Sequence, residues 1–567
     1  MKPWLFGNTT VRSPLRLRDG LAVLRHSALH GNLRGKEADC AFYELLGAAG
    51  IVDPKGDETC SVSRKWRSAL GQMGFLYPKL QGQAAALQSQ LGAADTITPN
   101  GERLLQNTTL GGWQLCFLRA LAAYYIPSPV EPKHDCPVFS PLRHVLGVMA
   151  ALQQQTGDES LSFMEMALFT QRTSSAMPAS QLATDILAFR MQRDAAPYKR
   201  KFDDAALQTA QQQDGIQASS LKDYADTNLR YLKATGLFLR KGRGIAFAPE
   251  KRSVIHALAQ EAFKPATDLA LLQSLTNGAT LPTDEIAGAW EALHDVSAAL
   301  QQYGEQPPVP TDLNQIADIA SLTATLQAQL EQHKETDYAH QQAGQVSDIL
   351  DYLALLTKRN RKLVRENDDI LEIPSSEAPA YFEWAVWRAF LAINSLVKPS
   401  WEARRFTIDR DFLPVGTAPG NGADMVFEFD DMVLVVEVTL TVSSRQEAAE
   451  GEPVRRHVAQ VIEQYEGTGK QVFGLFIAIN IDTNTANTFK LGEWYLKDDR
   501  KLDLHIIPLA LADFSCLLAA FTDHPSELLP HLKLLLRDCR MYANKDAPDW
   551  KQKISQLAQQ LATRQVT

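Results

Sequence analysis

Two carboxylates, Asp424 and Glu437, stand at the outer ends of two short apolar runs. The runs, residues 425–429 and 432–438, flank the polar pair Asp430-Asp431, a pattern typical of two strands joined by a tight turn. If the turn is centred on that pair, Asp424 lies directly across from Glu437, and two carboxylates on one face repel each other. A divalent cation would offset this repulsion most simply, because Mg²⁺ takes oxygen ligands from one or two carboxylates and from the phosphate of a substrate.

The same spacing permits plainer arrangements. The two carboxylates could lie at a solvated sheet edge, where water screens their repulsion. A turn of odd length would instead place the two side chains on opposite faces of the hairpin. From spacing alone, the metal site and both alternatives stay open.

The chain that must position these residues has the composition of a soluble globular protein. Its 567 residues suffice for three or four domains, 45% of them are hydrophobic and 22% are charged, and the mean hydropathy is −0.20. No apolar run approaches the roughly 18 residues of a membrane helix, and the first residues lack the apolar core of a signal peptide. We therefore expect a cytoplasmic protein without a membrane partner.

Charge and cysteine content narrow the class further. The net charge of −9 argues weakly against nucleic acid as a partner, although basic residues gather locally, above all before residue 70. The six cysteines include no CxxC pair, so we expect neither a zinc site nor a disulfide framework. Reduced, mostly buried thiols are the prediction.

Two segments before residue 290 have the element order of a winged helix. In the first, a helix over 37–50 is followed by a basic helix over 61–70 that begins with capping serines, then by strands near 74–77 and 96–98 and a helix beyond Pro99. In the second, a helix over 226–234 precedes a strand, the basic turn 240–244 and another strand. A basic helix in such a module can enter the major groove of double-stranded DNA.

The alternative is a module that serves only packing or protein contact, with basic side chains that are merely solvated. The residues that we expect to contact DNA are Arg34, Lys36, Arg64, Lys65, Arg67, Arg230, Lys233, Lys241 and Arg243.

The rest of the chain divides into a helical linker and an α/β region. The pattern predicts long helices over 312–334 and 337–366, and the basic residues between 358 and 365 either touch phosphates or form a solvated face. An amphipathic helix over 381–396 carries Glu383 at the edge of its apolar stripe. The hairpin follows, and then a helix over 453–466, strands over 471–479 and 505–508, and helices over 526–541 and 549–562.

A set of ordered blocks resembles the AlwI-type family of type IIS restriction endonucleases, and the resemblance covers nearly the whole chain. The blocks are Gly35-Lys36-Glu37, Thr98-Pro99-Asn100-Gly101, Arg230-Tyr231-Leu232, Phe382-Glu383-Trp384, Pro419 to Met425, Glu437-Val438-Thr439, Gly451 to His457, Leu475 to Ala478 and Ile506 to Leu509.

The resemblance implies a multidomain α/β protein whose N-terminal part is mainly helical. Winged-helix DNA-recognition domains would occupy residues 1–138 and 139–290, a helical linker 291–373, and a PD-(D/E)xK nuclease domain of α/β/α type 374–567. It implies cleavage of double-stranded DNA to one side of a short asymmetric site, with Mg²⁺ as cofactor and a cognate DNA methyltransferase in the same system. Some relatives dimerise transiently, whereas others nick one strand unless a small nuclease subunit joins them.

The resemblance places Asp424 and Glu437 as metal ligands, with Glu383 also at the metal and Glu452 completing the acidic site. The chain departs from the wider nuclease pattern at Thr439, which stands where that pattern has lysine, and at Ala423, which stands where it has proline. Threonine can neither bring positive charge to a phosphate nor act as a base near neutral pH.

We expect the role of the lost lysine to pass to Glu452, as a group that orients or deprotonates water, with help from His457. Each residue has a plainer interpretation. With Pro453 as the first helical residue, Glu452 would complement the helix dipole, and His457 would be a packed or surface imidazole. Two rival functions also stay open: a DNA-binding regulator or defence sensor with an inert nuclease-like domain, and a scaffold role for the α/β region.

Overall fold

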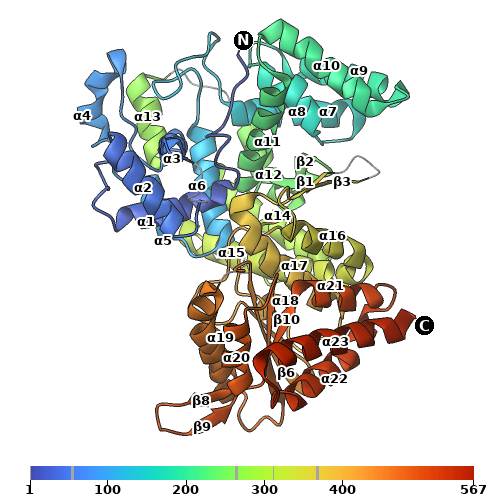
Figure 1. The fold of residues 1–567 in the computed structure, drawn as a ribbon. Coiled ribbons are helices and arrows are strands. Elements are labelled where there is room, and N and C mark those ends of the chain that lie inside the picture. Colours follow the sequence, from blue (N-terminus) through green and yellow to red (C-terminus); the bar gives the residue numbers. More distant parts are fainter. Residues whose placement is uncertain are drawn as a thin grey trace. The chain divides into compact units, whose positions relative to one another are not determined.

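The computed structural model describes residues 2–52, 57–261, 266–310, 312–365, 370–442 and 444–566. The chain is mostly helical and divides into two compact units, Met1–Leu330 and Glu331–Thr567 (Figure 1). None of the helices within these described ranges is long and apolar enough to cross a membrane.

The first unit is almost entirely helical. Its helices are α1 (Leu17–Arg25), α2 (Lys36–Ala48), α3 (Ser61–Gln72), α4 (Gln88–Leu91), α5 (Pro99–Gln106), α6 (Leu110–Ala123), α7 (Pro141–Thr156), α8 (Phe163–Leu168), α9 (Ala179–Ala195), α10 (Lys199–Asp214), α11 (Ala218–Ala234), α12 (Arg252–Gln260), α13 (Asp268–Asn277) and α14 (Ile286–Gln301). Its strands are β1 (Phe238–Lys241) and β2 (Gly244–Phe247).

The first basic module has the expected helices, but its strands shrink to one antiparallel bridge between Leu76 and Ile97. The prediction that serines cap α3 is wrong, because Ser61 is already helical and the Asp57 carboxylate accepts the backbone N–H of Val62 at 2.8 Å. In the second module, α11 and the β1–β2 hairpin confirm the predicted helix and strands.

The prediction of reduced cysteines is wrong for one pair. Cys40 of α2 and Cys60, which precedes α3, form a disulfide, because the packing of α2 on α3 brings their Cα atoms to 5.0 Å. The sequence gives no spacing signal for this contact. Of the free cysteines, Cys116 and Cys539 are buried and Cys516 is exposed.

The linker region differs from the two predicted helices. α15 (Ile316–Gln341) continues through the expected break, α16 (Val346–Leu356) ends early, and β3 (Lys362–Val364) pairs with β4 (Ile370–Glu372). The helix predicted to reach residue 366 is therefore wrong from residue 357 onward, and residue 366 itself lies outside the described ranges. Within the basic run 358–365, Arg365 bonds Asp348 and Asp351 and so helps to fix β3 beside α16.

The second unit is built on a four-stranded sheet of order β10-β7-β6-β5. The strands are β5 (Met425–Glu428), β6 (Met432–Thr439), β7 (Gln471–Ala478) and β10 (Ile506–Ala510), and a separate hairpin joins β8 (Glu493–Tyr495) to β9 (Lys501–Asp503). The helices are α17 (Ala378–Ala392), α18 (Ser400–Ala403), α19 (Arg445–Gln464), α20 (Thr483–Leu491), α21 (Leu511–Ala520), α22 (Leu528–Met541) and α23 (Ala547–Val566).

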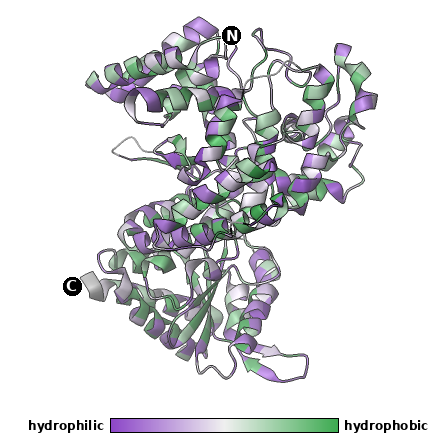
Figure 2. Cartoon of the chain, turned by 180° about the vertical axis from the view of Figure 1, so that it is seen from behind, coloured by the Kyte–Doolittle hydropathy of each residue, from purple (hydrophilic) through white to green (hydrophobic). Residues whose placement is uncertain are grey.

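The hairpin register agrees with the sequence-based prediction. β5 and β6 are antiparallel with Met425 opposite Val436, so the next pair outward is Asp424 and Glu437. β6, β7 and β10 are parallel to one another, which explains their nearly continuous apolar sequence, because both faces of parallel strands are covered. Figure 2 shows these strands as hydrophobic.

Alternate residues of the central strands pack on opposite sides of the sheet. Leu434 and Val436 of β6 belong to a core with α17, α21, α22 and α23, whereas Val433 and Val435 pack against α19. The unit is therefore an α/β/α arrangement, with the ends of β5 and β6 held between the two helical layers.

Two helices differ from their predictions in ways that affect the carboxylates. α17 is buried nearly all round rather than amphipathic, because the sheet lies on one side of it and α16 packs on another. α19 begins at Arg445 and continues through Pro453, so the prediction that this helix starts at Pro453 is wrong.

Candidate functional site

Asp424 and Glu437 meet at one end of the β5–β6 hairpin, as the register requires. The carboxyl groups of these two residues share a hydrogen bond, and one oxygen of Asp424 also accepts the backbone N–H of Val438 at 2.9 Å. Glu437 is 7% exposed and Asp424 is half-buried. The two side chains thus lie on one face, which excludes the arrangement on opposite faces, and the burial of Glu437 argues against a fully solvated pair.

Glu383 brings a third carboxylate from α17. The Glu383 side chain is buried, and its Oε2 accepts the backbone N–H of Ala418 at 2.8 Å. Burial, then the negative charges of Asp424 and Glu437, raise the pKa of Glu383 well above its ordinary value. A helix glutamate that would usually be exposed is here desolvated among like charges.

The pKa values of the hairpin pair shift in the same direction. Burial, followed by the charge of Glu437, raises the pKa of Asp424 well above its ordinary value. Burial raises the pKa of Glu437 to about 8, although its hydrogen bond with Asp424 works against the rise. Clustered carboxylates whose pKa values rise through burial and mutual repulsion are typical of functional sites, because the fold gains nothing from placing them together.

His457 of α19 contacts this cluster directly. The imidazole Nδ1 lies 2.6 Å from Oε1 of Glu437. Burial, then the positive charges of Arg456 and Arg405, lower the pKa of His457 to about 4, so the ring is neutral at physiological pH. Its Nε2 is buried and has no hydrogen-bond partner among the described residues.

Glu450, rather than Glu452, is the acidic residue of α19 that faces the cluster. The Glu450 side chain hydrogen-bonds Thr439, and its charge acts on Asp424, Glu437 and His457. We call Glu383, Asp424, Glu437 and Glu450 the acidic cluster.

Glu452 lies on the exposed side of α19, where it forms an ion pair with Arg456 at 3.0 Å. Sequence reasoning missed Glu450 because it started the helix at Pro453. A helix drawn through this proline would have put residues 450, 454 and 457 on one face, since residues three and four apart are neighbours on a helix.

The donor chemistry of the acidic cluster suits a hard divalent cation, because carboxylate oxygens are its preferred ligands. In this structure the carboxyl groups of Asp424 and Glu437 share a hydrogen bond with each other. Across the described parts of the chain, no group of three or more His, Cys, Asp or Glu side chains is arranged so that it could hold a metal ion. Asp424 and Glu437, with Glu383 beside them, are the residues that would hold such an ion.

The basic residues expected to contact DNA mostly have partners within the first unit. Arg34 forms a bidentate pair with Asp95, Arg64 and Arg67 contact Asp39, Arg230 pairs with Asp226, Lys241 pairs with Asp158, and Arg243 lies over the ring of Phe163. Lys36 and Lys65 are exposed and have no ion-pair or ring partner among the described residues, whereas Lys233 interacts with another residue.

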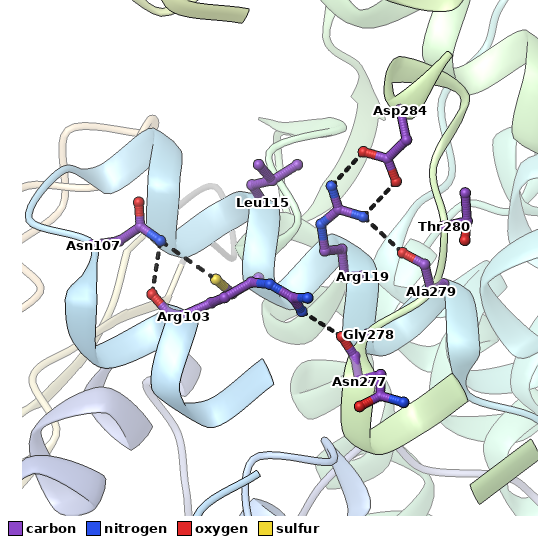
Figure 3. Close-up of a pocket in the computed structure, with 10 residues that line it drawn as sticks. Arg103, Asn107, Leu115, Arg119, Asn277, Gly278, Ala279, Thr280 and Asp284 are labelled. Carbon is purple, nitrogen blue, oxygen red and sulfur yellow. Dashed lines mark hydrogen bonds and ion pairs between the residues drawn. The ribbon is translucent and has the colours of Figure 1, made fainter. Parts of the chain in front are cut away.

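A cavity of about 410 Å³ lies in the first unit, between α5, α6 and the segment that follows α13 (Figure 3). Arg119 of α6 forms a bidentate pair with Asp284 and donates to the Ala279 carbonyl oxygen, while Arg103 of α5 donates to the carbonyl oxygen of Asn277. These arginines fasten the segment after α13 to α5 and α6, and none of the four acidic-cluster residues lines this cavity.

Comparisons with known proteins cover most of the chain. A family model described as AlwI restriction endonuclease matches residues 71–517. Among solved structures, the small subunit of the heterodimeric restriction endonuclease R.BspD6I is 24% identical over 37% of this chain and 98% of that chain, with a TM-score of 0.28. The BpuJ1 endonuclease binding domain, in complex with pyrene- and phenanthrene-modified DNA, is 10% identical over 46% of this chain and 89% of that chain, with a TM-score of 0.29. A search of curated proteins found no match.

Replacing one carboxyl group of the acidic cluster by an amide should stabilise the fold near pH 7 in metal-free buffer by roughly 1–2 kcal/mol. Burial and mutual repulsion raise the pKa values of these groups, and a neutral amide avoids the free-energy cost of that rise. Glu383→Gln and Asp424→Asn keep the acceptors for the N–H groups of Ala418 and Val438. The measurement is the urea midpoint of unfolding. Glu452→Gln, at an exposed position, is the control and should leave the midpoint unchanged. Amide variants that unfold more easily than the wild type would contradict the repulsion.

Proposed function

The chain belongs to the AlwI restriction endonuclease family, which makes it a site-specific deoxyribonuclease. From this premise we propose that it recognises a short asymmetric site in double-stranded DNA and hydrolyses a phosphodiester bond to one side of it. The acidic cluster, together with a divalent metal ion such as Mg²⁺, performs the hydrolysis. The observation that carries the proposal is the convergence of Glu383, Asp424 and Glu437 between two helical layers.

That convergence argues against an inert domain. Desolvated like charges destabilise a fold unless a partner compensates them. Glu383 comes from α17, Asp424 from the segment before β5 and Glu437 from β6, so no local sequence constraint keeps the three together. A scaffold or a sensor without activity would have no physical reason to retain them.

The bound metal ion would supply an activated water and neutralise charge that develops on the phosphate. The chain's own residues fix the carboxylates that hold this ion. The backbone N–H of Val438 orients Asp424, the backbone N–H of Ala418 orients Glu383, and the ring of His457 orients Glu437. Such supporting hydrogen bonds keep ligands in place.

His457 and Glu450 are positioned to guide the attacking water. When Nδ1 of His457 donates its proton to Glu437, Nε2 presents a lone pair, and this atom has no other partner in the described chain. Glu450 lies on the same face of α19 and interacts with both His457 and Asp424. In this proposal, His457 and Glu450 orient or deprotonate the water, which is the role that the sequence suggested for Glu452.

Purified protein should cut plasmid DNA with Mg²⁺ and should not cut it with EDTA. Asp424→Ala and Glu437→Ala should lower the cleavage rate by at least about 10³-fold, because each removes a ligand that holds the metal. Gel analysis followed by sequencing of the ends measures cleavage, and a gel-shift assay in EDTA should show DNA affinity unchanged. Variants that still cut would place the site elsewhere.

Glu450→Gln should slow single-turnover cleavage by about 10²-fold or more, whereas Glu452→Gln should change it less than about threefold. The two substitutions make the same chemical change two residues apart on one helix. Glu450 belongs to the acidic cluster, whereas Glu452 faces solvent beside Arg456. The reverse order of effects would restore Glu452 to the role that the sequence suggested.

We propose that the first unit reads the DNA site, with α3 as a groove-facing helix of a winged-helix module. Arg67 is tied to Asp39, so it holds α2 against α3 and is not available to bases. Lys65, on the same helix, is exposed and has no partner among the described residues. An unpaired lysine on a basic helix is suited to a phosphate contact.

Lys65→Ala should weaken DNA binding and reduce the dependence of log K on log salt concentration by about one unit, as expected for one lost phosphate contact. Lys79→Ala is the matched control, because Lys79 is also exposed but lies in the loop beyond α3. Fluorescence anisotropy over a range of salt concentrations provides the measurement. Equal slopes for wild type and Lys65→Ala would remove α3 from the interface.

One acidic cluster hydrolyses one strand at a time. Double-strand breaks would then need a transient homodimer or a separate small nuclease subunit, and a chain acting alone would nick. The plasmid assay distinguishes these, because nicked circles and linear molecules migrate differently.

A further inference from the structure

Hydrolysis of a phosphodiester places extra negative charge on the phosphate oxygens, and preorganised donors that face this charge accelerate the reaction. The wider nuclease pattern uses a lysine for this purpose, at the position where this chain has Thr439. The Thr439 hydroxyl bonds Thr441 and Glu450 and carries no positive charge. A positively charged side chain that adds to the effect of the metal ion has to come from another element of the chain.

Arg405 lies beside Asp424 through the backbone. The segment after α18 runs antiparallel to the start of β5, with Arg404 bridged to Met425 and the N–H of Arg405 donating to the carbonyl oxygen of Asp424 at 3.2 Å. This pairing fixes the Cα of Arg405 next to the metal-binding end of the hairpin.

The Arg405 guanidinium lies over the loop that leads into Asp424. Its Nη2 bonds Oδ1 of Asn421, and its Nη1 is 3.4 Å from the carbonyl oxygen of Ala423. A Cβ on Gly422 would stand only 2.2 Å from Nη1, so glycine at 422 is what allows this placement.

Arg405 acts electrostatically on the acidic cluster but forms no ion pair with it. It acts on both Glu437 and His457, and it lowers the pKa of each. Among the described residues Arg405 forms no ion pair, whereas its neighbour Arg404 is bound by both oxygens of Glu335. Two adjacent arginines thus differ: Arg404 is structural, and Arg405 keeps N–H donors and net charge for another ligand.

We propose that Arg405 is a catalytic residue whose guanidinium donates hydrogen bonds to a non-bridging oxygen of the phosphate being cut, in place of the missing lysine. The proposal rests on the proposed function. A guanidinium suits this task because its planar donors match phosphate oxygens and it stays protonated at all relevant pH values.

The structural alternative is that Arg405 only holds the loop 419–424 in place. Asn421→Ala tests this, because it removes the side-chain acceptor of Arg405 and leaves the guanidinium present. Arg456→Gln tests a general effect of charge, because Arg456 also acts electrostatically on His457 but is paired with Glu452 at the surface.

The first experiment compares single-turnover cleavage and EDTA-state DNA affinity for the full chain and its variants. Arg405→Gln should cut about 10²- to 10³-fold more slowly, the loss typical of one removed donor to a developing oxyanion. Arg405→Lys should recover part of the rate. In EDTA, Arg405→Gln should bind the natural duplex several-fold more weakly than wild type because it lacks one phosphate contact, and the other variants should keep an affinity close to wild type. Asn421→Ala and Arg456→Gln should each lose less than about fivefold, and a loss in either equal to that of Arg405→Gln would overturn the proposal.

The second experiment uses a duplex with a neutral methylphosphonate at the cut position, bound in EDTA. Wild type should bind this duplex several-fold more weakly than the natural one, and Arg405→Gln should not discriminate between them. Equal discrimination by both proteins would show that Arg405 does not touch this phosphate. The two proposals fail differently: a wild type that never cuts refutes the proposed function, whereas a cutting wild type matched in rate by Arg405→Gln refutes only this inference.

Discussion

The antiparallel register of β5 and β6 is the constraint on which the second unit depends. It sets Asp424 against Glu437 at the end of a hairpin whose inner residues are almost wholly buried. A shift of one residue would send one of the two carboxylates to the other face of the sheet. Packing on both faces of the sheet fixes this register, because alternate side chains of β6 fill two different hydrophobic cores. The two sets of side chains cannot exchange places without exposing one core and overfilling the other.

The helices α17 and α19 position charged and polar side chains of the site as well as packing against the sheet. α17 is buried on nearly all sides, so Glu383 has no solvated alternative to its place beside Asp424. α19 supplies His457, whose ring contacts Glu437. It also supplies Glu450, whose side chain hydrogen-bonds Thr439. Residues fixed on helices and strands hold a reactive geometry more precisely than residues on loops.

Sequence reasoning found the hairpin because two apolar runs around Asp430-Asp431 define both its strands and its register. It found Glu383 only through the resemblance to a family, since the burial of α17 depends on partners far away in the chain. It missed Glu450 because Pro453 suggested a helix start, although packing against the sheet keeps α19 helical through the proline. The Cys40–Cys60 contact likewise follows from tertiary packing and leaves no local signal.

The arrangement of charge explains how a chain of net charge −9 can work on a polyanion. Most of the arginines that the sequence offered for DNA are paired with carboxylates, as Arg34 is with Asp95, and a guanidinium whose charge is neutralised in this way attracts phosphate less. Near the acidic cluster the situation is reversed, because the carboxylates outnumber their partners and Arg405 has no ion-pair partner among the described residues. Attraction of DNA to this end of the hairpin therefore requires positive charge that the protein's own carboxylates do not cancel. A divalent ion held by Asp424 and Glu437, with the Arg405 guanidinium nearby, would meet that requirement.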